Sequence, residues 1–194
     1  SSKKFWNYDP VRKNLILSSL DMTDELLQEY VSIIREFQPD FFHVYPSVMT
    51  ILAKYMKKKE EPPFENIKAI LCCSEMLYPC QRILLEEVFQ CRVYSWYGHA
   101  ERAVLAGECE KNTDYHIFPE YGITELIDGQ DMLIEKANQA GEIVATGFNN
   151  YVLPFIRYKT GDLAVFSEQN CRCGREYPIL KKVIGREQEY FVDK

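Results

Sequence analysis

The stretch KAILCCSEMLYPCQRILLEEVFQCRVYSW, residues 68–96, places an amphipathic segment between two short apolar runs. The runs at 68–73 and 91–96 have the length and composition of buried strands. Pro79 suits the first position of the helix between them, which we expect to extend to about Phe89. A helix between two apolar strands is typical of a parallel pair joined by a crossover connection.

The same alternation precedes this stretch. Residues 23–37 repeat apolar side chains at helical spacing, with Thr23 able to cap the start and Pro39 preventing continuation. Residues 41–45 have the pattern of a second buried strand, and a further helix is expected from Pro46. The first half of the chain therefore predicts an α/β fold, a parallel sheet connected by crossover helices.

Beyond Cys109 the helical period disappears. Asp128-Gly129 is a turn signal of the kind found in hairpins. Short apolar runs predict strands at residues 123–127, 132–135, 141–146, 162–166 and 179–184. We therefore expect an α/β part over residues 1–107, followed by a β-rich, distorted barrel-like subdomain over residues 108–184.

The composition predicts a globular chain, with 46% hydrophobic and 27% charged residues. A formal net charge of −6 argues against a nucleic-acid partner. No apolar run approaches the roughly 20 residues of a membrane span, and no signal peptide is recognisable at the start. Seven cysteines without a secretory signal favour a reducing compartment. We therefore expect a cytoplasmic protein with neither nucleic acid nor membrane as partner.

Four loops carry groups that suit a nucleotide. Ser74-Glu75 and residues 97–101 follow expected strands, where parallel sheets bind their ligands. Residues 97–101, YGHAE, combine an aromatic ring, a glycine and a carboxylate, which suit a base and a metal-bound phosphate. Thr160-Gly161-Asp162 can present a carboxylate to a ribose diol, and Gly185-Arg186 adds a cation for phosphate. Taken singly, each loop also fits a purely structural role.

Taken in order, these loops resemble the motif set of adenylate-forming enzymes. Longer stretches are similar to the phenylacetate-CoA ligase branch of that superfamily, including its CapK-like members. These stretches are SEML at 74–77, YGHAE at 97–101, YHI at 115–117, LPFIRY at 153–158 and CRCGR at 171–175. The resemblance runs from about residue 25 to the end of the chain.

The resemblance implies a role for each matching position. Tyr97 would stack on adenine beside Gly98, and Asp162 would bind the ribose hydroxyls. Glu101 would act in catalysis by holding the magnesium ion that accompanies ATP. The remaining assignments are Arg186 on the ribose or the adenylate phosphate, Ser74 and Glu75 on the adenine and acyl side of the pocket, and Arg157 as a supporting ion-pair residue.

Enzymes of this kind join a carboxylate to AMP and then transfer the acyl group to coenzyme A. The resemblance therefore implies ATP or AMP, magnesium and coenzyme A as cofactors, and a small-molecule carboxylate, such as an aryl or arylacetic acid, as substrate. A homodimer is compatible with this reading. The phosphate-binding loop of the family is expected upstream of the matched region, and residues 185–194 are expected to form the hinge to a C-terminal lid. On that expectation these residues bind nucleotide weakly and do not turn over alone.

The cysteines suggest a second site. Cys171 and Cys173 form a close thiol pair in a loop, and Cys109 and His116 lie near the start of the β-rich part. Three thiolates and an imidazole would form a closed structural zinc site. The alternative is a buried Cys109 and a free 171/173 pair. The other cysteines, together with His43, are expected in or near the core, and no motif places a thiol beside an evident base.

Two other functions stay open at this point. The adenylate could pass to an amine, a carrier thiol or a deazaflavin, in capsule or polysaccharide biosynthesis. The chain could instead be a non-catalytic, zinc-stabilised nucleotide-binding module. The side chains that would select the acid are expected upstream of the matched region.

Overall fold

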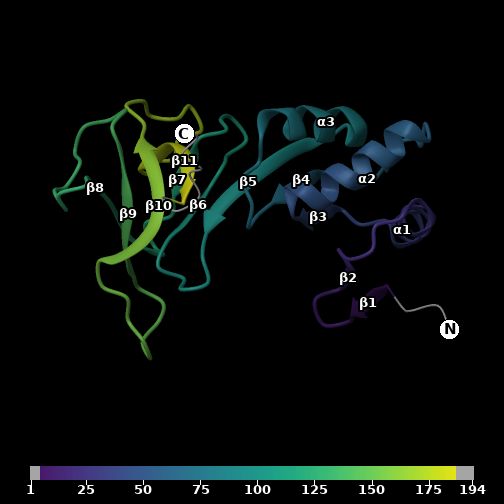
Figure 1. The fold of residues 1–194 in the computed structure, drawn as a ribbon, viewed down its shortest axis with the longest axis horizontal. Helices are drawn as coiled ribbons and strands as arrows, with labels where there is room; N and C mark the ends of the chain where they lie inside the picture. The colour runs from purple at the N-terminus through teal and green to yellow at the C-terminus, as the bar shows by residue number, and fades with distance from the viewer. Residues whose placement is uncertain (1–4, 187–194) are drawn as a thin grey trace, which may run out of the picture. The chain divides into compact units, whose positions relative to one another are not determined.

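The computed structural model describes residues 5–186, and the chain divides into two compact units, residues 1–93 and 94–194 (Figure 1). Each unit is a folded body with its own apolar core. Residues 187–194, which the sequence assigns to a hinge, lie outside the described part of the chain. None of the helices described is both long and apolar enough to cross a membrane.

The first unit is built from helices and short strands in alternation. A hairpin of β1 (Trp6–Asp9) and β2 (Asn14–Leu17) precedes the alternating part, whose strands β3 and β4 are parallel. The remaining elements are α1 (Asp24–Phe37), β3 (Phe41–Val44), α2 (Pro46–Lys58), β4 (Ala69–Cys72) and α3 (Pro79–Phe89). The predicted parallel sheet with crossover helices is confirmed.

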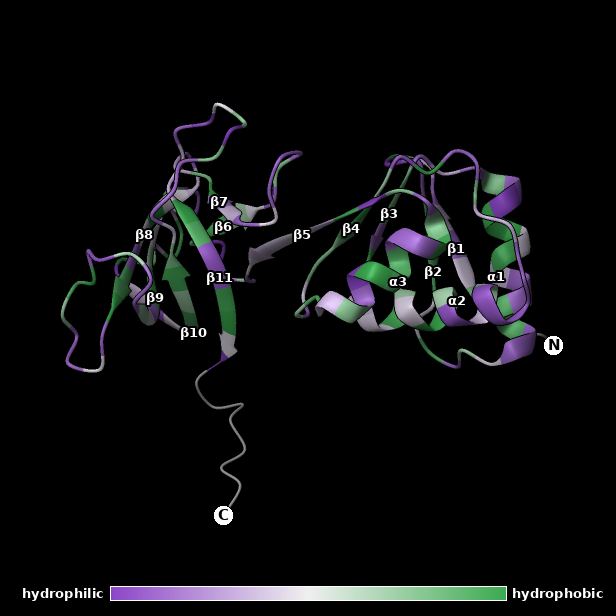
Figure 2. Ribbon diagram, turned by 90° about the horizontal axis from the view of Figure 1, so that it is seen from above, coloured by the Kyte–Doolittle hydropathy of each residue, from purple (hydrophilic) through white to green (hydrophobic). Residues whose placement is uncertain are grey.

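The helix boundaries follow the predicted signals. The Thr23 hydroxyl accepts the Leu26 N–H at the start of α1, and Gln38 ends that helix in a left-handed conformation with φ 52°. Pro46 and Pro79 begin α2 and α3 as the first helical residues. Hydrophobic and hydrophilic residues alternate around these helices, as the colouring of Figure 2 makes visible. The apolar faces bury residues such as Leu27, Ile34, Met56, Leu85 and Phe89.

Strand β5 (Arg92–Gly98) begins in the first unit and continues into the second. The second unit contains β6 (Leu105–Gly107), β7 (Tyr115–Ile117), β8 (Gly122–Ile127), β9 (Ala140–Gly147), β10 (Tyr158–Phe166) and β11 (Ile179–Arg186). Its hydrogen-bonded order is β5-β6-β7-β11-β10-β9-β8, and each described pair is antiparallel. The prediction of a β-rich subdomain is confirmed. Among the described strands of this unit, β5 and β8 stand at the two ends of the order, so these strands do not close into a barrel.

One predicted strand is reduced to a single bridge. Residues 132–135 make only an isolated antiparallel bridge between Ile127 and Leu133. The Asp128 side chain explains the interruption, because its Oδ1 accepts the backbone N–H groups of Gln130 and Met132 at 2.8 and 3.0 Å. This side-chain turn competes with extended pairing.

Candidate functional site

Two segments of the second unit carry a tyrosine and a carboxylate at the same spacing. Tyr97 and Glu101 lie at and just beyond the end of β5, and Tyr158 and Asp162 lie in β10. The Tyr97 hydroxyl donates to Oδ2 of Asp162 at 2.7 Å, and the Tyr158 hydroxyl donates to Oε1 of Glu101 at 2.9 Å. Each segment therefore supplies the tyrosine for the other segment's acid. We call these four residues the reciprocal tyrosine pairs.

Asp162 projects from a break in the ladder. The register of β10 on β9 shifts between Lys159 and Leu163, which frees the intervening residues from regular pairing. Gly161 adopts φ +75° there, a conformation that glycine tolerates far better than other residues. The Asp162 side chain is 12% exposed, so its carboxylate depends on the hydrogen-bond partners that the fold provides.

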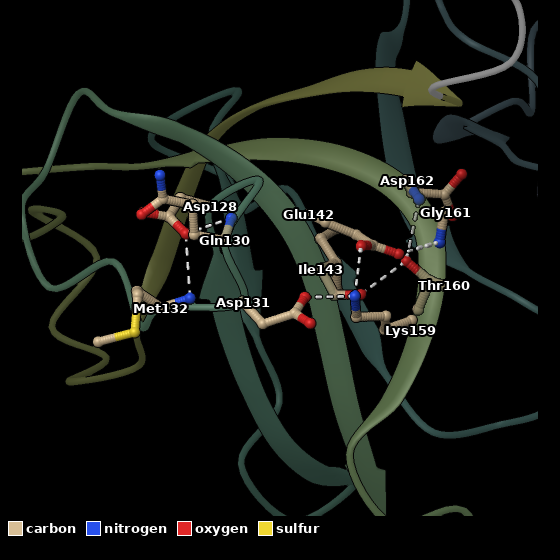
Figure 3. Close-up of polar contacts among 10 residues, drawn as sticks. All are labelled: Asp128, Gln130, Asp131, Met132, Glu142, Ile143, Lys159, Thr160, Gly161 and Asp162. Carbon is tan, nitrogen blue, oxygen red and sulfur yellow. Dashed lines mark hydrogen bonds and ion pairs between the residues drawn. The ribbon is translucent and has the colours of Figure 1, made fainter.

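Hydrogen bonds hold the turn in place (Figure 3). The Thr160 hydroxyl donates to the Ile143 carbonyl at 2.9 Å and accepts the Asp162 N–H at 3.1 Å. Glu142 Oε1 accepts the Gly161 N–H at 3.1 Å. The same close-up shows Lys159 between two acids of neighbouring segments, Asp131 and Glu142. The side chains of Glu142 in β9 and Thr160 in β10 therefore hold the backbone that carries Asp162.

Burial and the bond to Asp162 both favour the neutral phenol of Tyr97. Its pKa is raised, first by desolvation and then by the hydrogen bond to that carboxylate. Arg186 pairs with Asp162 across the β10–β11 ladder, and its Nε lies 3.5 Å from Oδ1 of the acid. The Arg186 side chain is 65% exposed, so most of its guanidinium remains available to a ligand. The predicted grouping of Tyr97, Asp162 and Arg186 is thus present in space.

Glu101 is oriented from two directions. Its pKa is lowered, first by its own backbone N–H and then by the Tyr158 hydroxyl. Nδ1 of His99 lies 3.0 Å from its other oxygen, although the N–H direction does not meet hydrogen-bond geometry. The His99 side chain is 9% exposed, and its ring lies 6.3 Å from that of Tyr97 and 6.0 Å from that of Tyr158. Glu101 is therefore an ionised, partly exposed carboxylate, which suits a hard cation.

Gly98 and the 74–75 loop have local structural roles. A Cβ on Gly98 would lie 3.2 Å from Leu105 Cδ1, so the β5–β6 pairing favours glycine there. Ser74 has φ 64°, and Glu75 accepts both the backbone N–H and the hydroxyl of Ser47 at 2.9 and 2.8 Å. Glu75 therefore caps the start of α2. Ser74 and Glu75 belong to the first unit, and the grouping above belongs to the second.

Cys109, His116, Cys171 and Cys173 come together in the second unit, and we call them the Cys/His cluster. Their donor atoms all lie within 4.8 Å of one another. The Cys109 and Cys171 sulfurs are 3.5 Å apart, and the Cys173 sulfur is 3.3 Å from Nε2 of His116. Strand β7 supplies the buried histidine, and the loop before β11 supplies two thiols. The donor types and their spacing fit a tetrahedral zinc ion.

Groups beside the Cys/His cluster favour the thiolate form of Cys173. The backbone N–H and then the guanidinium of Arg175 lower the pKa of Cys173 to about 6. Arg175 is held in turn by Glu110, at 3.1 Å. A cavity of about 200 Å³ adjoins the cluster and is lined in part by Cys109, His116 and Arg175. A thiolate is the form of cysteine that binds metal, so these neighbours favour binding.

Sequence reasoning missed two contacts. The first is the contact of Tyr158 with Glu101, because the sequence assigned no role to this tyrosine of the LPFIRY stretch. The signal was its four-residue spacing to Asp162, which repeats that of Tyr97 to Glu101. His43 was expected in the core, yet it is exposed, with Nε2 3.1 Å from Cys73 Sγ, so one thiol does lie beside a base. Cys80 is likewise exposed. Arg157 forms an ion pair with Glu125 at 3.1 Å, as its supporting role predicts.

Comparison with known proteins extends these observations. No family model matches the chain. Among curated proteins, it is 27% identical to Protein CapK of Staphylococcus aureus over 97% of this chain. It is 23% identical to the phenylacetate-coenzyme A ligase of Thermus thermophilus over 86% of this chain, and 26% identical to that of Pseudomonas putida over 89%. The chain spans 38–40% of the length of these relatives.

Solved structures agree with the fold. A 2-hydroxyisobutyryl-CoA ligase in the postadenylation state, in complex with 2-HIB-AMP, superposes with a TM-score of 0.76 at 25% identity. That match covers 89% of this chain and 37% of the ligase. Mycobacterium smegmatis MbtA superposes with a TM-score of 0.63 at 13% identity, which supports the fold alone. By sequence and by fold, the chain is therefore similar to adenylate-forming enzymes, with CapK and the phenylacetate-CoA ligases among the curated proteins that it resembles.

Proposed function

We propose that the chain supplies the adenosine-binding side of an ATP-dependent acid–CoA ligase. The main observation in support is that four residues named from the order of motifs lie in one unit of the structure. They are Tyr97, Glu101, Asp162 and Arg186. In this proposal Asp162 accepts hydrogen bonds from the ribose diol. The ring of Tyr97 packs on adenine, and Arg186 adds positive charge near the adenylate phosphate.

The proposed reaction has two steps. A carboxylate attacks the α-phosphate of ATP and releases pyrophosphate. The thiol of coenzyme A then attacks the acyl carbon of the adenylate, which forms the thioester and releases AMP. Glu101 would hold the magnesium ion, since a carboxylate with free lone pairs can coordinate this cation. The bound ion would neutralise the charge of the phosphates. The residues of this chain mainly orient and stabilise charge, and such preorganised electrostatics is a large part of catalysis.

An aryl or arylacetic acid is the proposed substrate class, since three of the similar proteins are named phenylacetate-coenzyme A ligases. Transfer to an amine, a carrier thiol or a deazaflavin is the second candidate. Pyrophosphate release from the full-length gene product, screened over aromatic, arylacetic and hydroxylated acids, decides the acid. Addition of coenzyme A or an amine to the preformed adenylate then decides the acceptor.

The test of the nucleotide site uses the ribose hydroxyls. Calorimetry should show that the chain binds AMP more tightly than 2′,3′-dideoxy-AMP. Replacing Asp162 with Asn should remove that preference, because the amide keeps the shape and loses the charge and one acceptor. Asp40→Asn, in an exposed ion pair of the first unit, is the matched control. Equal affinity of the unmodified chain for both nucleotides would rule out the assignment of Asp162.

We further propose that the Cys/His cluster holds one structural zinc ion. The four donors, their mutual spacing and the lowered pKa of Cys173 support a closed site in which zinc supplies cross-linking and no chemistry. Metal analysis of the purified chain should give one zinc per chain, and Cys171→Ser should reduce it. A chain without stoichiometric zinc that melts unchanged after chelation would contradict this proposal.

A further inference from the structure

Both oxygens of the Glu101 carboxylate are contacted by other side chains of the second unit. Tyr158, the first residue of β10, donates to Oε1 at 2.9 Å. His99, just beyond β5, places Nδ1 3.0 Å from Oε2. Glu101 stands in a surface turn closed by the Arg102 N–H on the His99 carbonyl. Its backbone alone would leave several rotamers open, so these contacts select one of them.

The Tyr158 bond is suited to a carboxylate that binds metal. A phenol donates one proton to one lone pair of the acid, so the other lone pairs remain for a cation. Side chains that hydrogen-bond a metal ligand fix its orientation, and their removal commonly weakens metal affinity by about 10-fold to 100-fold. The ring of Tyr158 is itself held edge-on by Phe155, with ring centroids 4.8 Å apart. The donor is therefore fixed before any ligand arrives.

The two reciprocal tyrosine pairs involve different acids, one assigned to the metal and one assigned to adenosine. Tyr97 contacts Asp162, the acid assigned to ribose, and Tyr158 contacts Glu101, the acid assigned to magnesium. The two hydrogen bonds share no atom, so removing the Tyr158 hydroxyl leaves the Tyr97–Asp162 bond without a direct change. This arrangement predicts that one hydroxyl affects metal-dependent binding and leaves metal-independent binding intact.

We propose that Tyr158 is a positioning residue that fixes Glu101 for the magnesium ion of a bound nucleoside triphosphate. The inference rests on the proposed function, since it takes Glu101 to face the phosphates. It adds a residue that acts on the metal through the side chain of Glu101 and contacts neither the nucleotide nor the substrate carboxylic acid. It also assigns a purpose to the tyrosine of the LPFIRY stretch, which the adenosine site does not use.

The chain contains a matched control. Tyr177 donates to Oε1 of Glu120 at 2.8 Å, and neither residue belongs to the reciprocal tyrosine pairs. In both tyrosines the hydrogen bond to a glutamate is the leading cause of a raised pKa. Tyr158→Phe and Tyr177→Phe therefore remove the same kind of bond from the same unit. Any general cost of losing a tyrosine–glutamate bond should appear in both variants.

The experiment measures ATP affinity of the 194-residue chain at a series of magnesium concentrations, and AMP affinity without magnesium. Tyr158→Phe should raise the magnesium concentration for half-maximal ATP binding about 10-fold. It should leave AMP affinity within about 2-fold, and Tyr177→Phe should change neither value. Melting temperatures of both variants show that the fold is retained.

The outcomes separate the inference from the function on which it rests. If the unmodified chain binds neither AMP nor ATP, the proposed function fails. If it binds both nucleotides and magnesium does not strengthen ATP binding, Glu101 holds no metal and the inference is overturned. An unchanged magnesium dependence in Tyr158→Phe, or an equal change in Tyr177→Phe, overturns it as well. A parallel loss of AMP affinity in Tyr158→Phe would show a structural role.

Discussion

The reciprocal tyrosine pairs and the Cys/His cluster are two groups of polar side chains in the same unit, and they differ in their donor atoms. The tyrosine pairs consist of oxygen groups. Their member Glu101 is partly exposed, as is Arg186, which pairs with Asp162. The cluster consists of three sulfurs and an imidazole, with Cys109 and His116 buried. Carboxylates with free lone pairs suit an exchangeable ligand, and a closed set of soft donors suits a permanent one. The difference predicts which changes abolish binding and which destabilise the fold.

The largest effect is expected at the Cys/His cluster. Cys173→Ser should lower the free energy of unfolding of the second unit by about 4 kcal/mol or more, because a metal ligand is lost and polar groups stay buried. For a unit of this size that corresponds to a fall in melting temperature of roughly 15 °C or more. Differential scanning calorimetry of the zinc-loaded chain measures it.

The control for that prediction is Cys80→Ser, which alters an exposed cysteine of α3 in the first unit. It should change the melting temperature by no more than about 2 °C, as is usual for exposed positions. Equal melting temperatures for Cys173→Ser and Cys80→Ser would remove the distinction between the two groups, because the cluster would then contribute nothing to the fold.

The next effect is on binding alone. Asp162→Asn should weaken AMP binding by about 10-fold to 100-fold, as expected when hydrogen bonds to a charged group are lost, with little change in melting temperature. Calorimetric titration of AMP, together with a thermal melt of the same sample, measures both quantities. A large fall in stability without a change in affinity would mean that Asp162 belongs to the fold, like the Cys/His cluster.

Alkaline pH should destabilise the tyrosine side of the comparison. Burial raises the pKa of Tyr97, and the bond to Asp162 raises it further. Its contribution to stability is therefore complete below the ordinary tyrosine pKa of about 10 and is lost as pH rises from there toward the folded value. The melting temperature of the unmodified chain should fall as pH rises above about 10, and that of Tyr97→Phe should fall less. Identical alkaline profiles would mean that the phenol ionises freely.

Most residues of the candidate site could be named from the sequence, because they lie in short local motifs. Thr160-Gly161-Asp162 needs only a bulge in one strand to present its acid, and the motif encodes that bulge through its glycine. The cluster could be predicted from cysteine and histidine alone, since few other arrangements satisfy four such donors. The proline-initiated helices of the first unit were predictable for the same local reason.

What the sequence could not reveal depends on contacts between distant residues. Tyr158 and Glu101 are 57 positions apart, and only the pairing of strands brings them within hydrogen-bond distance. His43 was expected in the core because it follows two phenylalanines, but alternation along β3 leaves it on the exposed face. The contacts of Glu75 with the start of α2 are of the same kind, because they join residues 28 positions apart. A single sequence carries no information about such partners.

The smallest effect is expected from Arg186, which lies at the edge of the proposed adenosine site. Its guanidinium is 65% exposed and 3.5 Å from the Asp162 carboxylate, so its contribution is a surface charge interaction of about 1 kcal/mol or less. Arg186→Gln should weaken AMP binding about 3-fold at low ionic strength, and the difference should largely vanish near 0.5 M salt, where the Debye length is about 4 Å. AMP titrations of both chains at two salt concentrations measure it. A loss as large as that of Asp162→Asn, persisting in high salt, would mean that Arg186 makes a buried, bidentate phosphate contact once the nucleotide is bound.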